Sequence, residues 1–388
     1  AIVQALSKKL LVTEKLISHR FDINDASSAY ELLLNGKPSL GILLEYPNKV
    51  DLNNKSIQLR PNSRLKYYNN KPILAFIGSG NYACRTLIPA FKKHKALFHT
   101  ISAPDGLRPL HFGKKYEFMN ASTDIQSTID NEDINTIVIA TRHESHCDLV
   151  KRSLLAGKNV FVEKPLCINR EQFNSLIKLY KDSEISQKQK KLPLLMVGFN
   201  RRFSPLVEVI KKHLSNISAS KTFIFTCNAG SLPENHWLQD PLIGGGRLIG
   251  EACHFVDLIR FLADSKIIDM SIVKSMNSGP VEDTFTIQIK FDNGSIGTVH
   301  YFSNGSKSFP KERLEVFADG KIFQIDNFRK LKCWGINGFK NISYLKQNKG
   351  QNLCTNSFVQ AISSEGKEPI PLDQIFEVHD WLLKLEEK

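Results

Sequence analysis

This chain of 388 residues lacks any C-x-x-C motif. It has seven cysteines, an odd number, so they cannot all be paired in disulfides. A disulfide framework and a zinc ribbon are therefore poor explanations of the sequence, and a reducing cytoplasm fits best. No apolar run reaches the length of a membrane span, and the first residues lack the charged-then-apolar layout of a secretory signal. We expect a cytoplasmic protein without a membrane partner.

Acidic residues are scarce relative to basic ones, with 39 Asp and Glu against 52 Lys and Arg, which gives a net charge of +13. One interpretation is an anionic partner, such as a cofactor phosphate or a nucleotide-linked substrate. The other is that lysine is scattered over a solvated surface, because basic stretches such as 187–191 are short. No nucleic-acid motif accompanies the charge, so we expect no nucleic-acid partner.

A glycine-rich turn follows an apolar run. Ile73–Ile77 is typical of a buried strand, and it leads directly into Gly78-Ser79-Gly80-Asn81-Tyr82-Ala83. Glycine permits the tight bend and the close approach of backbone to a pyrophosphate at a helix N-terminus. Ala83 takes the place of a third glycine, which this fingerprint permits. The turn therefore predicts a dinucleotide site formed by residues 78–82.

The next strand leaves the choice between NAD and NADP open. Leu97–Ile101 ends in Ser102-Ala103-Pro104-Asp105, without an acid at the position that usually holds the ribose 2′-hydroxyl. Asp105 lies slightly late, and Arg108 would instead face a 2′-phosphate. Ser102 and Arg108 are therefore candidate cofactor residues.

A third strand, Ile137–Ala140, runs into a polar turn that contains Thr141, Arg142, His143 and His146. At the carboxyl end of a parallel strand these residues would contact the ribose and nicotinamide side of a cofactor. Helix capping and loop packing are the alternative roles for the two histidines.

A fourth strand, Val160–Val162, runs into Glu163-Lys164-Pro165. A lysine held at this strand end would hydrogen-bond a substrate hydroxyl and stabilise a developing alkoxide. The alternative for Lys164 is an ordinary salt bridge.

A second glycine cluster, Gly244–Gly246, opens a helix that carries Glu251, His254 and Asp257. A lone histidine on a helix is usually structural, but one flanked by carboxylates is a better acid–base candidate. His, Glu and Asp also bind metals, yet no clear third-ligand partner accompanies them, and we expect no metal.

The pattern of predicted elements indicates three regions. Residues 63–197 alternate strands and helices, which predicts a Rossmann doubly wound parallel sheet. Residues 198–388 contain hairpin turns such as Asp292-Asn293-Gly294, which predict an α+β domain for substrate binding with a large, mainly antiparallel open sheet. The free face of such a sheet is a ready surface for oligomerisation.

Residues 1–62 are predicted to form a strand, a helix, a second strand and then a linker from residue 47. These few elements cannot bury their own apolar side chains, which include Leu33, Leu34 and Leu43. We therefore expect a docked segment rather than an independent domain.

The motifs together resemble those of the Gfo/Idh/MocA oxidoreductases over about residues 70–388. They are the glycine turn, the Ala-Thr-x-His-x-x-His strand end, Glu163-Lys164-Pro165, Asn200-Arg201-Arg202-Phe203-x-Pro205 and the glycine–histidine helix. The resemblance implies NAD or NADP as cofactor, with Glu163, Lys164 and Arg201 beside it. It also implies a sugar, nucleotide-sugar or cyclitol substrate and a homodimer or homotetramer formed through the open sheet.

For the site, the resemblance implies Lys164 and His254 as the catalytic pair. Substrate contacts are expected from Lys164, Asn200, Trp237, Arg247, His254 and Asp257. The family commonly has Asp four residues before the histidine, where this chain has Gly250. Either Glu251, the next residue, substitutes for that acid, or the acid is dispensable.

Residues 1–62 resemble the C-terminal end of a zinc-type medium-chain alcohol dehydrogenase. The whole chain thus resembles the C-terminal part of bi-domain oxidoreductases from bacterial surface-polysaccharide loci. The zinc ligands and cofactor fold of that first module are missing from this sequence, so it is expected to contribute no chemistry.

The predicted function is an NAD(P)-dependent oxidoreductase acting on a secondary alcohol or ketone of a sugar or nucleotide sugar. Lys164 would polarise the reacting oxygen while His254 carries the proton. The alternative is a non-catalytic NAD(P)-binding sensor or regulatory protein, because Gly250 stands where the family acid is expected.

Overall fold

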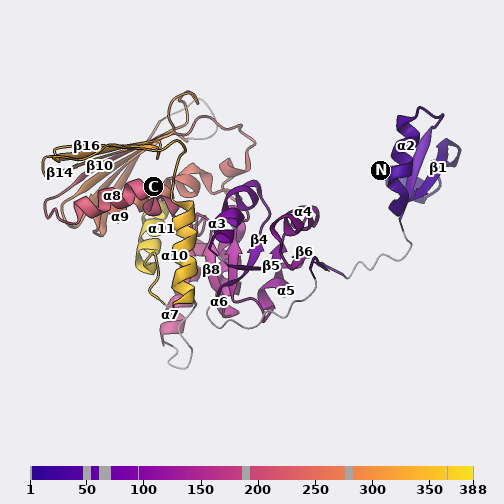
Figure 1. Cartoon of the computed structure of the whole chain (residues 1–388), viewed down its shortest axis with the longest axis horizontal. Helices are drawn as coiled ribbons and strands as arrows, with labels where there is room; N and C mark the ends of the chain where they lie inside the picture. Colours follow the sequence, from indigo (N-terminus) through magenta and orange to yellow (C-terminus); the bar gives the residue numbers. More distant parts are fainter. Residues whose placement is uncertain are drawn as a thin grey trace. The chain divides into compact units, whose positions relative to one another are not determined.

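The computed structural model describes residues 2–46, 54–60, 71–94, 96–185, 193–275, 283–364 and 366–387. Its internal contacts divide the chain into two compact units, residues 1–55 and residues 56–388 (Figure 1). Within the described ranges, no helix combines the length and the apolar character needed to cross a bilayer.

The first unit is a small β–α–β arrangement. Its elements are α1 (Ile2–Ser7), β1 (Ile17–Asp22), α2 (Ala26–Leu34) and β2 (Gly41–Glu45), and the two strands pair in parallel. The predicted order of strand, helix and strand is confirmed. Leu33 is 57% exposed and Leu34 is 85% exposed. The docking surface expected for these side chains stays a prediction.

Seven described strands form the mainly parallel sheet of the second unit, in the order β3-β6-β5-β4-β7-β8-β9. They are β3 (Ser56–Gln58), β4 (Ile73–Ile77), β5 (Leu97–Ser102), β6 (Asn120–Ser122), β7 (Thr136–Ile139), β8 (Asn159–Val162) and β9 (Leu195–Val197). The predicted doubly wound sheet is confirmed. Antiparallel β3 pairs with β6 at the edge, inside the stretch predicted to be a linker. The second unit therefore begins at Ser56, earlier than the predicted boundary after residue 62.

The helices between these strands are α3 (Ile88–Lys92), α4 (Leu107–Tyr116), α5 (Ile125–Asp130), α6 (His146–Leu155) and α7 (Arg170–Ile185). The chain winds outward from β4 in one direction and from β7 in the other. Because such crossovers are right-handed, the helices cover both faces of the sheet. Both faces of β4 are consequently buried, and the Phe76 ring meets the edges of Phe91, Phe98 and Phe118 at centroid distances of 5.7, 5.8 and 5.8 Å.

A second sheet has the order β11-β12-β13-β10-β14-β15-β16-β17. Its strands are β10 (Thr222–Asn228), β11 (Ile267–Lys274), β12 (Phe285–Phe291), β13 (Ile296–Phe302), β14 (Glu312–Ala318), β15 (Lys321–Asp326), β16 (Lys330–Trp334) and β17 (Ile342–Ser343). Only β10 and β13 pair in parallel among these strands. The hairpin predicted at Asp292-Asn293-Gly294 is confirmed as β12–β13, and β14–β15 forms another antiparallel pair.

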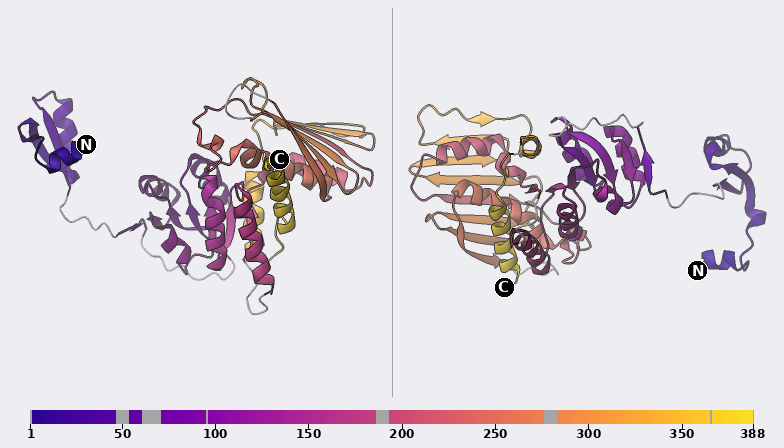
Figure 2. Two further views of the ribbon diagram at one scale, coloured as in Figure 1. Left: turned by 180° about the vertical axis from the view of Figure 1, so that it is seen from behind. Right: turned by 90° about the horizontal axis from the view of Figure 1, so that it is seen from below.

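Two helices, α8 (Pro205–Leu214) and α9 (Cys253–Ala263), cover one face of this second sheet (Figure 2). Outward-facing positions on the strands include Val273, Phe317 and Trp334, which are exposed. The sheet is therefore open on one side, as the hairpin pattern predicted.

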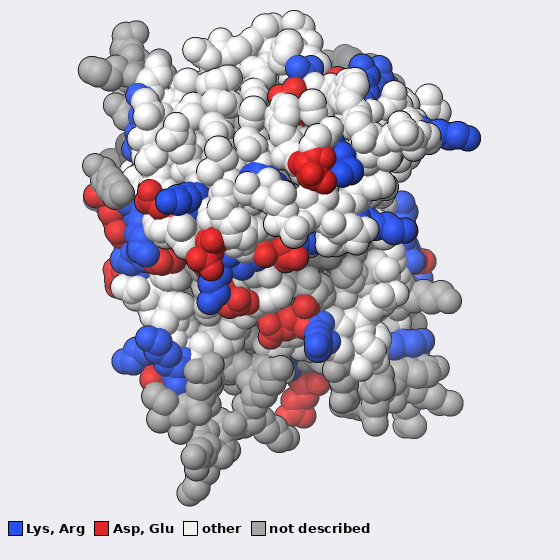
Figure 3. Space-filling view, turned by 90° about the vertical axis from the view of Figure 1, so that its left-hand side faces the viewer, with Lys and Arg blue, Asp and Glu red and all other residues white. Residues whose placement is uncertain are grey.

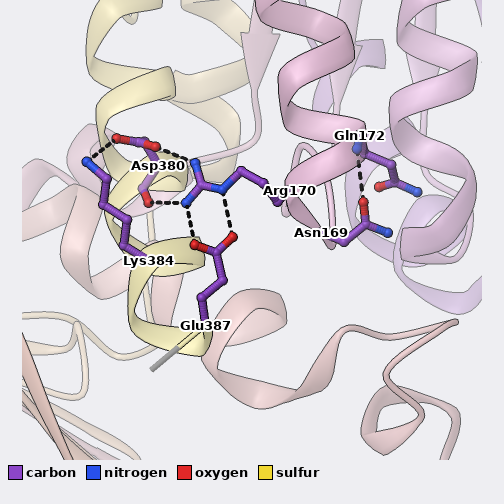
Figure 4. Close-up of polar contacts among 6 residues, drawn as sticks. All are labelled: Asn169, Arg170, Gln172, Asp380, Lys384 and Glu387. Carbon is purple, nitrogen blue, oxygen red and sulfur yellow. Dashed lines mark hydrogen bonds and ion pairs between the residues drawn. The ribbon is translucent and has the colours of Figure 1, made fainter.

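The C-terminal helices α10 (Gln351–Ser363) and α11 (Leu372–Glu386) return the chain to the first sheet. Arg170, at the start of α7, forms ion pairs with Asp380 at 2.5 Å and with Glu387 at 2.8 Å (Figure 4). Lys384 completes the group by pairing with Asp380 at 2.7 Å. The backbone N–H of Leu166 also donates to Nε2 of His379 on α11, at 2.9 Å. These contacts fasten α11 to the parallel-sheet half.

Charged side chains of both signs intermingle on the face shown in Figure 3. No large patch of one sign is visible there, which agrees on this face with scattered lysine.

Candidate active site

The glycine turn lies where the ends of three strands meet. Gly78 has φ of 106°, and a Cβ there would lie 2.4 Å from the carbonyl oxygen of Ala140, just after β7. Its N–H donates to the Ser102 carbonyl at the end of β5, at 2.8 Å. Only glycine tolerates this conformation and this crowding. A Cβ on Gly80 would meet nothing within 4 Å, so bare backbone faces open space. These residues fit a dinucleotide pyrophosphate.

Tyr82 is 41% exposed and ends the turn, and one π-helical turn, η3 (Ala83–Leu87), then leads into α3. On the other side, Nε of Arg108 donates to the Ser79 carbonyl at 2.7 Å. The predicted cofactor residues of the turn and of α4 therefore lie side by side.

His143 and His146 act as packing residues in this structure. Nδ1 of His143 hydrogen-bonds the Gly244 carbonyl at 2.7 Å, and Nδ1 of His146 hydrogen-bonds the Pro165 carbonyl at 2.7 Å. Burial lowers the pKa of His143 to about 3 and that of His146 to about 4, so both rings are neutral donors at physiological pH. The hydrogen bonds of these two side chains correspond to loop packing, the alternative to cofactor contact that the sequence left open.

The neighbouring predicted residues remain closer to the surface. Thr141 pairs its hydroxyl with that of Ser145 at 2.7 Å. The guanidinium of exposed Arg142 lies 5.9 Å from the ring centre of Trp237, whose ring meets His143 edge-on at 4.8 Å. The strand end after β7 and the segment before the glycine cluster thus form one wall.

Lys164 projects from the end of β8 into the second half of the molecule. Its side chain is only partly buried, and Nζ donates a 2.6 Å hydrogen bond to the carbonyl oxygen of Gly250. Gly250 lies in another π-helical turn, η7 (Leu248–Ala252), directly before α9. Such turns are frequent at functional sites. Lys164 therefore forms a hydrogen bond to backbone rather than the salt bridge considered from sequence.

Glu163, the residue before it, is buried against Gly198. A Cβ on Gly198 would lie 2.9 Å from Oε1 of Glu163. Burial raises the pKa of Glu163 to about 7, against the opposing charge of Lys164. Its protonation state therefore changes near neutral pH.

Glu251 faces Lys164 from the same turn as Gly250. Burial alone would raise the pKa of Glu251, but the charges of Lys164 and Lys311 outweigh burial and hold this pKa below its usual range. The hydroxyl of Tyr301 on β13 donates to the Glu251 carboxylate. Glu251 is consequently a fixed anion beside Lys164.

His254 stands in the first turn of α9. Its ring centre lies 6.1 Å from that of Phe199, and Nδ1 is buried without a partner in the described part of the chain. Burial, followed by the charges of Arg201 and Lys164, keeps the pKa of His254 well below its usual value. The imidazole is therefore neutral.

Other predicted ligand residues are engaged inside the protein. Asp257 is fully buried and forms a two-bonded ion pair with Arg202. Arg201 forms a similar pair with Glu312, with both N–O distances at 2.9 Å. Buried carboxylates need such partners, so the structure does not bring Asp257 to the substrate side or leave Arg201 free for a cofactor.

Arg247 and Asn200 also have internal partners. Arg247 donates to the Gly230 carbonyl at 2.8 Å and pairs with Asp283 at 3.4 Å. The Asn200 amide donates to the Lys349 carbonyl at 2.6 Å.

Sequence reasoning missed Tyr301, Glu312 and Lys349. Strand alternation marks Tyr301 as inward-facing, but nothing in the sequence links it to Glu251 across 50 residues. Lys349 pairs with Glu312 at 2.8 Å, so two cations share one buried carboxylate. Over the described ranges, no group of three or more His, Cys, Asp or Glu side chains is arranged to hold a metal ion.

Comparison with known proteins completes this description. Residues 74–186 match the GFO/IDH/MocA oxidoreductase family, NAD-binding Rossmann fold, and residues 221–323 match the GFO/IDH/MocA C-terminal domain. Together these matches cover more than half of the chain. The chain belongs to the Gfo/Idh/MocA family. The predicted family and NAD-binding Rossmann fold are thereby confirmed.

Within the Gfo/Idh/MocA family, the chain is similar to a levoglucosan dehydrogenase of Pseudarthrobacter phenanthrenivorans. The two are 25% identical over 222 residues, which is 49% of this chain and 55% of the relative. A myo-inositol 2-dehydrogenase of Thermotoga maritima is 24% identical over 242 residues, covering 61% of this chain and 69% of the relative. The chain thus spans about half the length of the first relative. An oxidoreductase domain protein from Kribbella flavida shares the fold, with a TM-score of 0.71, 17% identity and coverage of 82% and 96%.

Proposed function

We propose that this protein is an NAD(P)-dependent oxidoreductase that interconverts a secondary alcohol and a ketone on a sugar or nucleotide sugar. The observation that carries the proposal is the Lys164–Gly250 hydrogen bond of 2.6 Å. This bond joins the end of β8, which carries the Lys164 amine, to the turn η7. That turn contains Glu251 and leads into α9, the helix of His254. The relatives named as levoglucosan and myo-inositol dehydrogenases support the same chemistry.

Each residue has a defined task in the proposed mechanism. Bound at Gly78–Asn81, the dinucleotide would supply a hydride acceptor or donor. The Lys164 ammonium exchanges its carbonyl partner for the substrate oxygen and stabilises the developing alkoxide. Neutral His254 accepts the hydroxyl proton at a ring nitrogen during oxidation and returns it during reduction. Glu251, fixed by Tyr301, balances the charge of Lys164.

The charge around His254 favours a nucleotide sugar over a neutral sugar. Arg201 and Lys349 share the single carboxylate of Glu312, which leaves one positive charge uncompensated. Lys164 and Lys311 also depress the pKa of His254. An excess of positive charge attracts ligands of the opposite sign, and a nucleotide diphosphate would meet that requirement.

The wider setting is part of the same proposal. The first unit is proposed to be a tail like that of a medium-chain dehydrogenase, in an enzyme of cytoplasmic surface-polysaccharide biosynthesis. Exposed Val273, Phe317 and Trp334 on the open sheet support a homodimer or homotetramer formed through that face.

A sensor without turnover is the second candidate, favoured by the lack of an acid at Gly250. A screen separates the two functions: UDP-sugars, free sugars and cyclitols are offered with NAD⁺ and NADP⁺ while nicotinamide absorbance is followed. Sustained turnover of any of them supports the dehydrogenase and eliminates the sensor. Cofactor binding without turnover across the whole panel would overturn the proposed function.

A further inference from the structure

A pocket of about 410 Å³ lies beside the glycine turn, on the side of α4. Its lining residues are Asn81, Arg85, Leu107, Arg108, His111 and Phe112. Two guanidinium groups and an imidazole line this pocket, and no carboxylate does. The lining therefore has the chemistry of an anion site.

Arg108 is held in a defined orientation over the turn. Its Nε donates to the Ser79 carbonyl at 2.7 Å, and Nη2 donates to Oδ1 of Asn81 at 3.1 Å. The guanidinium also lies 5.7 Å from the ring centre of Phe112. Arg108 therefore has two hydrogen bonds to the turn and a contact with one aromatic ring. The guanidinium is thus held in one orientation at the edge of the pocket that it lines.

The end of β5 offers no acid to a ribose. Ser102 occupies the strand end, where its buried hydroxyl has no partner within the described ranges. Oδ1 of Asp105 accepts the backbone N–H of Arg108 at 3.2 Å, so this carboxylate serves the start of α4. The carboxylate that usually binds the 2′-hydroxyl of an NAD ribose has no equivalent at this strand end.

We infer that this pocket selects NADP(H) over NAD(H) by holding the 2′-phosphate between Arg108 and Arg85. The inference rests on the proposed cofactor site, but it is independent of the proposed substrate. Arginine matches phosphate geometry and forms charge-assisted hydrogen bonds with it. Two such contacts predict a preference of roughly 10- to 100-fold for the phosphorylated cofactor.

The test measures the equilibrium binding of NADPH, NADH and 2′,5′-ADP to the full chain by calorimetry. The wild-type protein should bind NADPH at least about 10-fold more tightly than NADH. Arg108→Leu should lose roughly 10- to 100-fold in affinity for NADPH and 2′,5′-ADP, while NADH binding changes little. Arg85→Leu should act in the same direction and leaves the hydrogen bonds of Arg108 to the turn in place. Lys114→Leu, an exposed lysine on the same helix outside the pocket, is the matched control and should change none of these affinities.

Equal affinity of the wild-type protein for NADPH and NADH would overturn the inference. So would a matched loss of both cofactors in Arg85→Leu. NADPH selectivity without turnover of any sugar would sink the proposed function alone, whereas turnover with NAD⁺ in preference to NADP⁺ would sink only this inference.

Discussion

The carbonyl oxygen of Gly250 accepts a 2.6 Å hydrogen bond from Nζ of Lys164, and a side chain on the same glycine would be tightly packed. A Cβ at position 250 would lie 3.0 Å from Cε1 of His143 and 3.0 Å from Cδ1 of Leu238. An aspartate at this position would therefore crowd His143 and Leu238, whereas the neighbouring Glu251 supplies an anion beside Lys164.

Restoring the family acid should damage the protein. We expect Gly250→Asp to lower the free energy of unfolding by about 1–3 kcal/mol, because the new side chain overpacks the wall formed by His143 and Leu238. Urea unfolding measures the loss, and Gly250→Ala should show a smaller one. A Gly250→Asp protein with unchanged stability and higher turnover would show that the site has room for the acid.

Removing the Tyr301 hydroxyl should shift a pH profile. In Tyr301→Phe the stacking on Phe285, at a ring distance of 5.0 Å, is kept, but the hydrogen bond to Glu251 is lost. That bond helps to lower the pKa of Glu251, so its loss raises this pKa. We expect the acid limb of kcat/KM to move to higher pH. An unmoved limb would mean that ionised Glu251 is not required.

Buried neutral histidines should make the fold sensitive to acid. Burial lowers the pKa of His379 from 6.5 to about 4, and Nε2 already accepts the N–H of Leu166. The unfolded chain takes up this proton between those two values, so stability is full above pH 6.5 and falls as pH decreases toward 4. Urea unfolding at several pH values should show a slope reduced by about one proton, roughly 1.4 kcal/mol per pH unit, in His379→Gln. An unchanged slope would contradict the assignment.

The first unit should matter for solubility or assembly rather than for the cofactor site. A protein shortened to begin at Ser56 keeps β3 paired with β6. We expect it to change its oligomeric state or solubility while NADPH binding is retained, since exposed leucines of the first unit need a partner surface. Light scattering and calorimetry provide the two readouts. If the shortened and full-length proteins have the same solubility, oligomeric state and thermal midpoint, residues 1–55 contribute to none of these properties.

Local signals in the sequence predicted much of this fold. The glycine turn after Ile73–Ile77 and the hairpin at Asp292-Asn293-Gly294 depend on neighbouring residues, and both are present. Pairings across long stretches of chain were not predictable: β3 with β6, and β10 in parallel with β13. No local pattern identifies which distant strands meet.

The lack of information on distant contacts also explains which site residues could be predicted from the sequence. The turn, Lys164 and His254 could be singled out because each lies at an element boundary with its own motif, and their roles stay predictions. Asp257 was expected to face substrate, but its partner Arg202 lies 55 residues away in sequence. Burial and ion pairing decide whether a charged residue is structural, and both depend on the tertiary fold.

Single-turnover hydride transfer in Lys164→Met tests the central claim most directly. The variant should bind NADPH like the wild-type protein, because the predicted phosphate contacts lie at Gly78–Asn81 and Arg108. With a substrate accepted by the wild-type protein, we expect the transfer rate to fall by roughly 100-fold or more, as when one preorganised donor to a developing oxyanion is removed. A rate within a few-fold of wild type would contradict the role assigned to Lys164.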